Sequence, residues 1–253
     1  MRTSISDDNI YPNFCEQASQ DTMIFNTFRI NNKYTGILEH VTFQQGLVYL
    51  DLIKKRNPEL LKNIYKYSTN DSVGSPMKLM YDIGHFSPTT IRYIKVLGDL
   101  INEFGNLDNL DIVEIGCGYG GQSKIIMDTF NIKSYTFIDL PQVLKLTKRF
   151  LESTNVDMSK VIFKDITQLT NNENYDLIIS NYAFTECVKS IQLTYFDKVI
   201  NKSKMGYITA NFISDIFNID YLTKDELLSM IKNYYIKDEE PITHPNNFIL
   251  LWK

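Results

Sequence analysis

The residues best suited to chemistry lie in one short segment, residues 111–121, with the sequence Asp-Ile-Val-Glu-Ile-Gly-Cys-Gly-Tyr-Gly-Gly. Its apolar start is typical of a buried strand, and helical spacing of apolar residues begins after it. A strand, a glycine turn and a helix start together form a cradle for a nucleotide, because glycine allows close approach to the main chain and the helix start offers free N–H groups. The predicted cradle residues are Gly116, Cys117, Gly118 and Gly120.

Glu114 indicates which nucleotide-containing ligand the cradle would hold. The glycine spacing also fits the G-x-G-x-x-G pattern of dinucleotide enzymes, which is a weak signal by itself. Glu114 stands two residues before Gly116, where a carboxylate would repel a pyrophosphate but suit the ammonium group of a cofactor that carries an amino acid. S-adenosylmethionine joins a nucleoside to an amino acid, so we expect this cofactor. A structural turn with an incidental glutamate is the alternative.

Strands and helices alternate from residue 87 to the end of the chain, which predicts an α/β fold with a parallel sheet covered by helices on both faces. The expected strands are 112–115, 135–138, 161–163, 175–180, 207–212, 234–237 and 248–252, and the expected helices include 87–104, 141–151, 191–200 and 224–233. Ligands bind such sheets at the carboxyl ends of the strands. Polar residues stand at four of these ends, namely Glu114, Asp139, Asp165 and Asn181.

Residues 1–86 lack this alternation and predict a mainly helical cap, which would bind the methyl acceptor, before a catalytic domain at 87–253. Apolar spacing predicts a helix over 40–56, and Pro58 can open a second one. Residues 68–76 are rich in Ser, Thr, Asn, Asp and Gly, which favours a loop or hinge.

Composition narrows the class of partner. The formal charge of −4, without a basic cluster, argues against a nucleic-acid substrate. No apolar run approaches the ~20 residues of a membrane span, and the polar N-terminus does not resemble a secretory signal. The three cysteines are far apart and form no C-x-x-C pair, so we expect no metal site and a reducing cytoplasm. A small-molecule partner is expected, and a homodimer is possible.

From residue 87 onward the chain resembles the class I S-adenosylmethionine-dependent methyltransferases. The resemblance lies in Glu114 with the glycines after it, in Asp139, in the pair Asp165-Ile166, and in Ser180-Asn-Tyr182. It implies a Rossmann-like sheet of seven mostly parallel strands with the last strand antiparallel. It also implies that Asp139, with Leu140 beside it, binds the ribose, and that Asp165 and Ile166 contact adenine.

Several stretches are more narrowly similar to bacterial sugar O-methyltransferases associated with surface polysaccharides. They include Leu38-Glu-His-Val41, Ser87-Pro-Thr-Thr-Ile-Arg-Tyr93 and Ser180-Asn-Tyr-Ala-Phe-Thr-Glu186. This resemblance implies O-methylation of a sugar, a sugar nucleotide or a related phosphorylated precursor of capsule or lipopolysaccharide. Cys117 departs from the small residue common at its position, and we do not expect it to be a nucleophile.

A hydroxyl acceptor must lose its proton as the methyl group arrives, so a base is expected within hydrogen-bond reach. The candidates are Glu186 after the fourth strand, His85 before the first predicted helix and His244 in the final loop; His40 is more often structural. Histidine has the more suitable pKa, whereas Glu186 is better placed. Tyr182 could wall the methyl site. Arg92 could hold the cofactor carboxylate or an acceptor phosphate.

Three other functions remain open. Asn181-Tyr-Ala-Phe184 superficially resembles the N-P-P-[FY] motif of methyltransferases that act on amino groups, such as a nucleobase or a protein amide, but both prolines are absent. A partner subunit that binds the cofactor without catalysis would tolerate loss of Glu186 and the histidines. A dehydrogenase would bind NAD instead.

Overall fold

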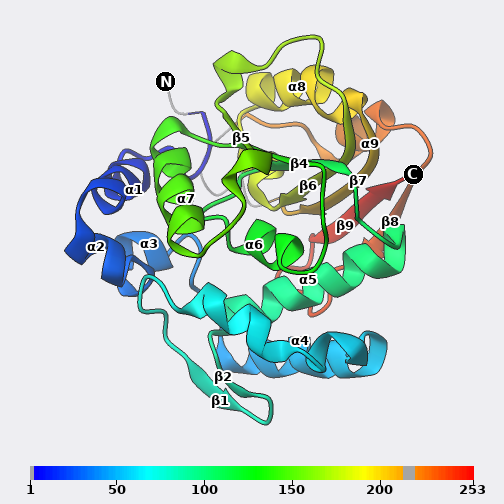
Figure 1. Cartoon of the computed structure of the whole chain (residues 1–253). Helices are drawn as coiled ribbons and strands as arrows, with labels where there is room; N and C mark the ends of the chain where they lie inside the picture. The colour runs from blue at the N-terminus through cyan, green and yellow to red at the C-terminus, as the bar shows by residue number, and fades with distance from the viewer. Residues whose placement is uncertain (1–2, 213–219) are drawn as a thin grey trace.

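The computed structural model describes residues 3–212 and 220–253, and its centre is one seven-stranded sheet (Figure 1). The spatial order is β5-β4-β3-β6-β7-β9-β8. Neighbours from β5 to β7 are parallel, whereas β9 runs antiparallel to both β7 and β8. The predicted fold class is therefore confirmed. The strands are β3 (Asp111–Ile115), β4 (Ser134–Ile138), β5 (Val161–Lys164), β6 (Tyr175–Asn181), β7 (Ser203–Ala210), β8 (Tyr234–Asp238) and β9 (Phe248–Trp252).

Side chains of each buried strand point alternately to the two faces of the sheet. Both faces therefore carry apolar side chains, and helices cover both of them. Ile112 of β3 belongs to the apolar cluster shared with α5, α6 and α7, whereas its neighbour Val113 packs in the cluster of α8 and α9. These helices are α5 (Pro88–Phe104), α6 (Gly121–Met127), α7 (Pro141–Ser153), α8 (Lys189–Lys198) and α9 (Lys224–Met230), with 3₁₀ turns at Met158–Lys160, Ile166–Gln168, Ala183–Glu186 and Ile200–Lys202.

Local capping chemistry sets several helix ends where the sequence predicts them. The Ser87 hydroxyl accepts a hydrogen bond from the Thr90 amide at 3.1 Å, and Pro88 opens α5. Thr223 and Glu226 form a capping box at α9. The fifth strand differs from the prediction: β7 begins at Ser203 and ends at Ala210, since its polar first residues become extended through pairing with β6.

The region before α5 contains four short α-helices, three 3₁₀ helices and a small hairpin among its described residues. Residues 1–2 of the predicted cap lie outside the described part. The elements are α1 (Ile10–Gln20), α2 (Thr22–Thr27), η1 (Phe28–Ile30), α3 (Asn32–Thr35), α4 (Phe43–Arg56), η2 (Pro58–Leu61), η3 (Ile64–Asp71), β1 (Leu79–Tyr81) and β2 (Gly84–Phe86). The predicted loop or hinge at 68–76 is wrong in its first half, because η3 continues through Asp71 and buries that side chain.

A buried charge network holds this N-terminal region against the start of α5. Arg29 is 1% exposed and contacts Glu39 at 2.5 Å and Asp71 at 3.1 Å. Asp71 in turn accepts hydrogen bonds from the Ser87 amide at 2.6 Å and the Thr90 hydroxyl at 2.7 Å. The network therefore joins residues 29–71 to the helix that leads into β3.

The N-terminal region also shares an apolar core with the rest of the chain. Phe28 and Tyr34 make edge-on ring contacts, and Phe28 packs on Tyr119 at 5.8 Å between ring centroids. The same cluster continues through α5, α6 and α7, and α1 lies beside α7 (Figure 1). The division at residues 86 and 87 stays a proposal about function, since packing is continuous across it.

We predict that Arg29→Ala lowers the free energy of unfolding by roughly 3–5 kcal/mol, because it leaves two carboxylates buried without their partner. Urea denaturation followed by circular dichroism measures this value. Arg56→Ala is the matched control, because Arg56 and its partner Glu240 are exposed, and we expect a loss below about 1 kcal/mol. Equal losses for the two variants would contradict the structural role of the network.

Candidate active site

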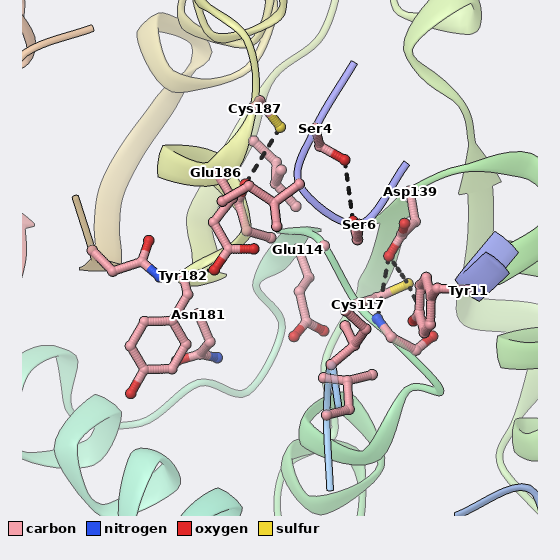
Figure 2. A pocket seen from close by; sticks show the side chains of 18 of the residues that line it. Ser4, Ser6, Tyr11, Glu114, Cys117, Asp139, Asn181, Tyr182, Glu186 and Cys187 are labelled. Carbon is pink, nitrogen blue, oxygen red and sulfur yellow. Dashed lines mark hydrogen bonds between the residues drawn. The ribbon is translucent and has the colours of Figure 1, made fainter. Parts of the chain in front are cut away.

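A cavity of about 650 Å³ opens at the carboxyl ends of the central strands (Figure 2). Its volume lies in the range of small-molecule and cofactor sites. Thirteen of the fifteen predicted site residues line it, from β3 and β6, from the turns that follow strands, from α5 and from the final loop. They are Arg92, Glu114, Gly116, Cys117, Gly118, Asp139, Leu140, Asp165, Ile166, Asn181, Tyr182, Glu186 and His244.

Two predicted site residues lie elsewhere. His85 is exposed in the hairpin strand β2, opposite Met80, and does not line the cavity. This placement gives no support to the prediction of His85 as a catalytic base, which stays untested. Gly120 is also absent from the cavity wall; it caps α6 with φ +89°, and a Cβ atom there would lie 2.9 Å from Thr147 Cγ2. Its role is to shape the turn.

The turn after β3 brings main chain and side chains very close together. Gly116 has φ +77°, and a Cβ atom there would lie 1.9 Å from the Ala183 Cβ. The Gly118 carbonyl accepts a hydrogen bond from the Thr147 hydroxyl at 2.6 Å. Only glycine fits at position 116 both sterically and in its backbone conformation, so β3 and the segment after β6 pack directly on each other.

Glu114 projects into the cavity between Asp139 and Tyr182 in the view of Figure 2. The residue is 2% exposed, and its carboxylate accepts one hydrogen bond, from the Tyr135 hydroxyl at 2.9 Å. Burial raises the pKa of Glu114 to about 8. Among the described residues no cation pairs with it. A cationic group of a ligand could therefore supply the missing partner.

Asp139 follows β4 and is held by the turn itself. Its carboxylate accepts hydrogen bonds from the Gly118 amide at 3.2 Å and the Leu140 amide at 2.8 Å. Burial raises its pKa to about 6, against the opposing effect of these bonds. Asp165 caps the next turn by accepting from the Thr167 amide at 2.8 Å, and Ile166 beside it is half-buried. Both residues line the cavity.

Glu186 is the last residue of the short helix after β6, and the side-chain amide of a residue that follows β7 binds its carboxylate. Asn211, just after β7, donates from Nδ2 to Glu186 Oε1 at 2.7 Å. Burial raises the pKa of Glu186 despite this bond. A carboxylate with a raised pKa beside a cavity suits a general base, so this role stays a prediction with a favourable geometry.

Tyr182 connects the other end of the cavity to the final loop. It has φ +69°, an uncommon conformation for a bulky residue, and its hydroxyl donates to Glu239. The guanidinium carbon of Arg92 lies 4.6 Å from the centroid of its ring. His244, in the final loop, also lines the cavity. Its Nδ1 accepts a weak hydrogen bond from the Asn246 amide.

Several walls of the cavity come from segments that the sequence patterns did not indicate. We call residues Thr3–Asp8 the N-terminal strap; all of them except Asp7 line the cavity. The strap pairs with the segment around Glu186, where the Ile5 amide donates to the Glu186 carbonyl at 3.1 Å. Residues 37–49 contribute Leu38, Tyr49 and His40, which was given a mainly structural role. Asn211 could have been found, since it follows the fifth strand as Asn181 follows the fourth.

Among the described residues, no group of three or more His, Cys, Asp and Glu side chains is arranged to hold a metal ion. None of the described helices combines the length and apolar character needed to cross a membrane. All three cysteines are free and buried.

Residues 94–206, from α5 into β7, match the family model of the methyltransferase small domain. A malonyl-[acyl-carrier protein] O-methyltransferase from Acetivibrio thermocellus is 30% identical over 142 residues, covering 49% of each chain. The chain thus spans about half the length of this curated relative. These matches support the expectation of a methyltransferase domain around the glycine turn.

Two solved structures are similar to this chain, and the first of them supports the fold. A candidate sarcosine dimethylglycine methyltransferase from Galdieria sulphuraria is 15% identical with a TM-score of 0.50, covering 71% of this chain and 77% of its own. An N-methyltransferase from Bradyrhizobium japonicum, crystallised with S-adenosylhomocysteine, is 15% identical with a TM-score of 0.47 and covers 63% of this chain and 83% of its own. At such identities the first likeness establishes a methyltransferase-type fold.

We predict that Gly116→Ala destabilises the protein more than Gly105→Ala does. Both positions have positive φ, which costs an L-residue about 1–2 kcal/mol, but a Cβ at Gly105 would meet no atom within 4 Å. The overlap with Ala183 is additional at position 116. Unfolding free energies from urea titration of both variants give the difference, and equal losses would contradict the close packing of the turn.

We predict that Glu114→Gln gains stability relative to the wild type as the pH rises from 5 to 8. Native Glu114, with its pKa of about 8, keeps its proton in this range, whereas the unfolded chain loses it. The wild type therefore loses up to about 1.4 kcal/mol per pH unit at this group, and glutamine does not. Urea titrations at pH 5.5 and 7.5 measure the change, with exposed Glu59→Gln as the control. Parallel pH dependences of wild type and Glu114→Gln would refute the buried protonated state.

Proposed function

We propose that this protein is an S-adenosylmethionine-dependent methyltransferase that acts on an oxygen of a small molecule. The observation that carries the proposal is the Glu114 carboxylate, buried beside a glycine turn and without a cationic partner among the described residues. The ammonium group of an amino-acid cofactor supplies that charge. A dinucleotide pyrophosphate would instead be repelled there.

The other cofactor contacts follow from the same end of the cavity. Asp139 would accept hydrogen bonds from the ribose hydroxyls, because it is the carboxylate at the end of β4. Leu140 and Ile166 would enclose the adenine, and the Asp165 carboxylate, which also caps the turn Ile166–Gln168, would accept a hydrogen bond from the adenine amino group. Gly116, Cys117 and Gly118 would bring the main chain against the ligand, and Asn181 would border the methyl group.

When bound, S-adenosylmethionine supplies a methyl group that is already activated as a sulfonium. The chain must then hold the acceptor oxygen in line and exclude water. The N-terminal strap and Tyr182 would shield the cavity, which they line from different sides. Glu186 would take the proton from the acceptor hydroxyl, with Asn211 fixing its orientation. His244 and His40 are the other cavity bases.

For the acceptor we propose a sugar, a sugar nucleotide or a related phosphorylated capsule or lipopolysaccharide precursor, on the resemblance of residues 38–41, 87–93 and 180–186 to sugar O-methyltransferases. A carboxylate acceptor is the second candidate, supported by the name of the Acetivibrio thermocellus relative. A carboxylate would need no base. We propose a cytoplasmic setting, consistent with three free cysteines, and a homodimer remains a further possibility for the assembly.

Two rival functions stay distinguishable. An N-methyltransferase would transfer the methyl group to a nitrogen, which mass spectrometry of the product identifies. A silent cofactor-binding subunit would bind S-adenosylmethionine without turnover. The charge of −4 gives little support to a nucleic-acid acceptor.

We predict that Glu186→Gln lowers kcat by roughly 10²–10⁴-fold with a hydroxyl acceptor, the usual effect of removing a general base. The wild-type rate should rise with pH through the raised pKa of Glu186, since the base must be deprotonated, and the variant should lose this rise. Transfer of labelled methyl from S-adenosylmethionine to a panel of sugar nucleotides measures both. The exposed Glu152→Gln is the control. An unchanged rate and pH profile in Glu186→Gln would refute the base.

A further inference from the structure

Two arginines are buried in the described part of the chain near the cavity, and their surroundings differ sharply. Arg29 is enclosed by Glu39, Asp71 and the Asn70 carbonyl. Arg92 is 8% exposed and lines the cavity, yet none of the described side chains forms an ion pair or hydrogen bond with it. Its one close polar contact is the face of the Tyr182 ring.

Burial removes most of the water from the Arg92 guanidinium, and no described side chain accepts from its several N–H donors in place of that water, which is costly. The carboxylate of Glu239 acts electrostatically on Arg92 but is committed elsewhere. It accepts from the Tyr182 hydroxyl, from the Thr243 amide at 2.9 Å and hydroxyl at 2.7 Å, and from Asn247 at 3.0 Å. The protein thus satisfies Glu239 without Arg92 and leaves the arginine facing the cavity.

The surroundings of Arg92 assign it to the acceptor side. Its electrostatic neighbours are Tyr182, Tyr49, Tyr93 and Glu239. Burial lowers the pKa of His40, and the charge of Arg92 lowers it further. These residues come from the N-terminal region, α5, the segment after β6 and the final loop. The glycine turn, Asp139 and Asp165, which would hold the nucleoside, are not among them.

We propose, on the basis of the proposed function, that Arg92 forms an anion subsite and that the methyl acceptor carries an oxyanion, either phosphate or carboxylate, separate from the methylated oxygen. The planar guanidinium would bind two oxygens of this group side by side, with the Tyr182 ring behind it. The Tyr49 hydroxyl lines the same cavity and forms no hydrogen bond to a described residue, so it can donate to the same anion. Arg92 is thereby a specificity determinant for acidic acceptors.

The test uses the full chain as wild type, Arg92→Gln and Arg92→Lys. Thermal melts are recorded in 10 mM phosphate, malonate or chloride at constant ionic strength, each with and without saturating S-adenosylhomocysteine. We expect phosphate or malonate to raise the melting temperature of the wild type by roughly 2–4 °C. The melting temperature of Arg92→Gln should not change, and the shift of Arg92→Lys should lie between the two. The anion that gives the larger shift identifies the acidic group.

Calorimetric titration of S-adenosylhomocysteine into wild type and Arg92→Gln shows whether Arg92 binds an acidic group of the acceptor or the carboxylate of the cofactor. An affinity in Arg92→Gln within about threefold of the wild type is the expected result. A loss of tenfold or more would assign Arg92 to the cofactor carboxylate and overturn the inference, as would wild-type melts that respond to neither anion. If S-adenosylhomocysteine fails to bind the wild type, the proposed function fails, whereas the anion melts without it still decide the subsite.

Discussion

The site depends on one electrostatic constraint, the burial of a carboxylate that the protein does not pair. Glu114 is the penultimate residue of β3, at the carboxyl end of the strand, and its side chain lines the cavity. Tyr135 gives it one hydrogen bond, and burial keeps its pKa near 8. A core that served stability alone would replace such a group with an apolar side chain. The arrangement becomes favourable when a ligand brings a positive charge.

The rest of the fold encloses this charge. The sheet collects Glu114, Asp139 and Asn181 at one edge, since parallel strands end together there. The buried network around Arg29 fixes the N-terminal region against α5, so that residues 37–49 and the N-terminal strap can wall the opposite side (Figure 1). The final loop adds His244 to the wall, and Glu239 accepts a hydrogen bond from the Tyr182 hydroxyl. A cavity of cofactor size results from segments far apart in the chain.

Local patterns predicted the sheet and the cofactor end of the site, because the glycine turn, Glu114 and Asp139 are each encoded within a few residues of a strand end. The acceptor end was harder to predict. His85 was proposed from its place before a helix, but strand pairing with Met80 directs it outward. Asp71 stood in a polar stretch that suggested a hinge, and its burial depends on Arg29, which lies 42 residues earlier in the sequence. Such long-range partners leave no local signal.

Calorimetric titration of S-adenosylhomocysteine and NAD into the wild type and Glu114→Gln measures whether Glu114 pairs with the ammonium group of the cofactor. We expect binding of S-adenosylhomocysteine to strengthen as the pH rises toward 8, because the ammonium group binds the deprotonated carboxylate. We expect a loss of roughly 1–3 kcal/mol in Glu114→Gln, the usual magnitude for a charged hydrogen-bonding partner, and no binding of NAD. Tight binding of NAD, or equal affinity for S-adenosylhomocysteine in both proteins, would contradict this pairing.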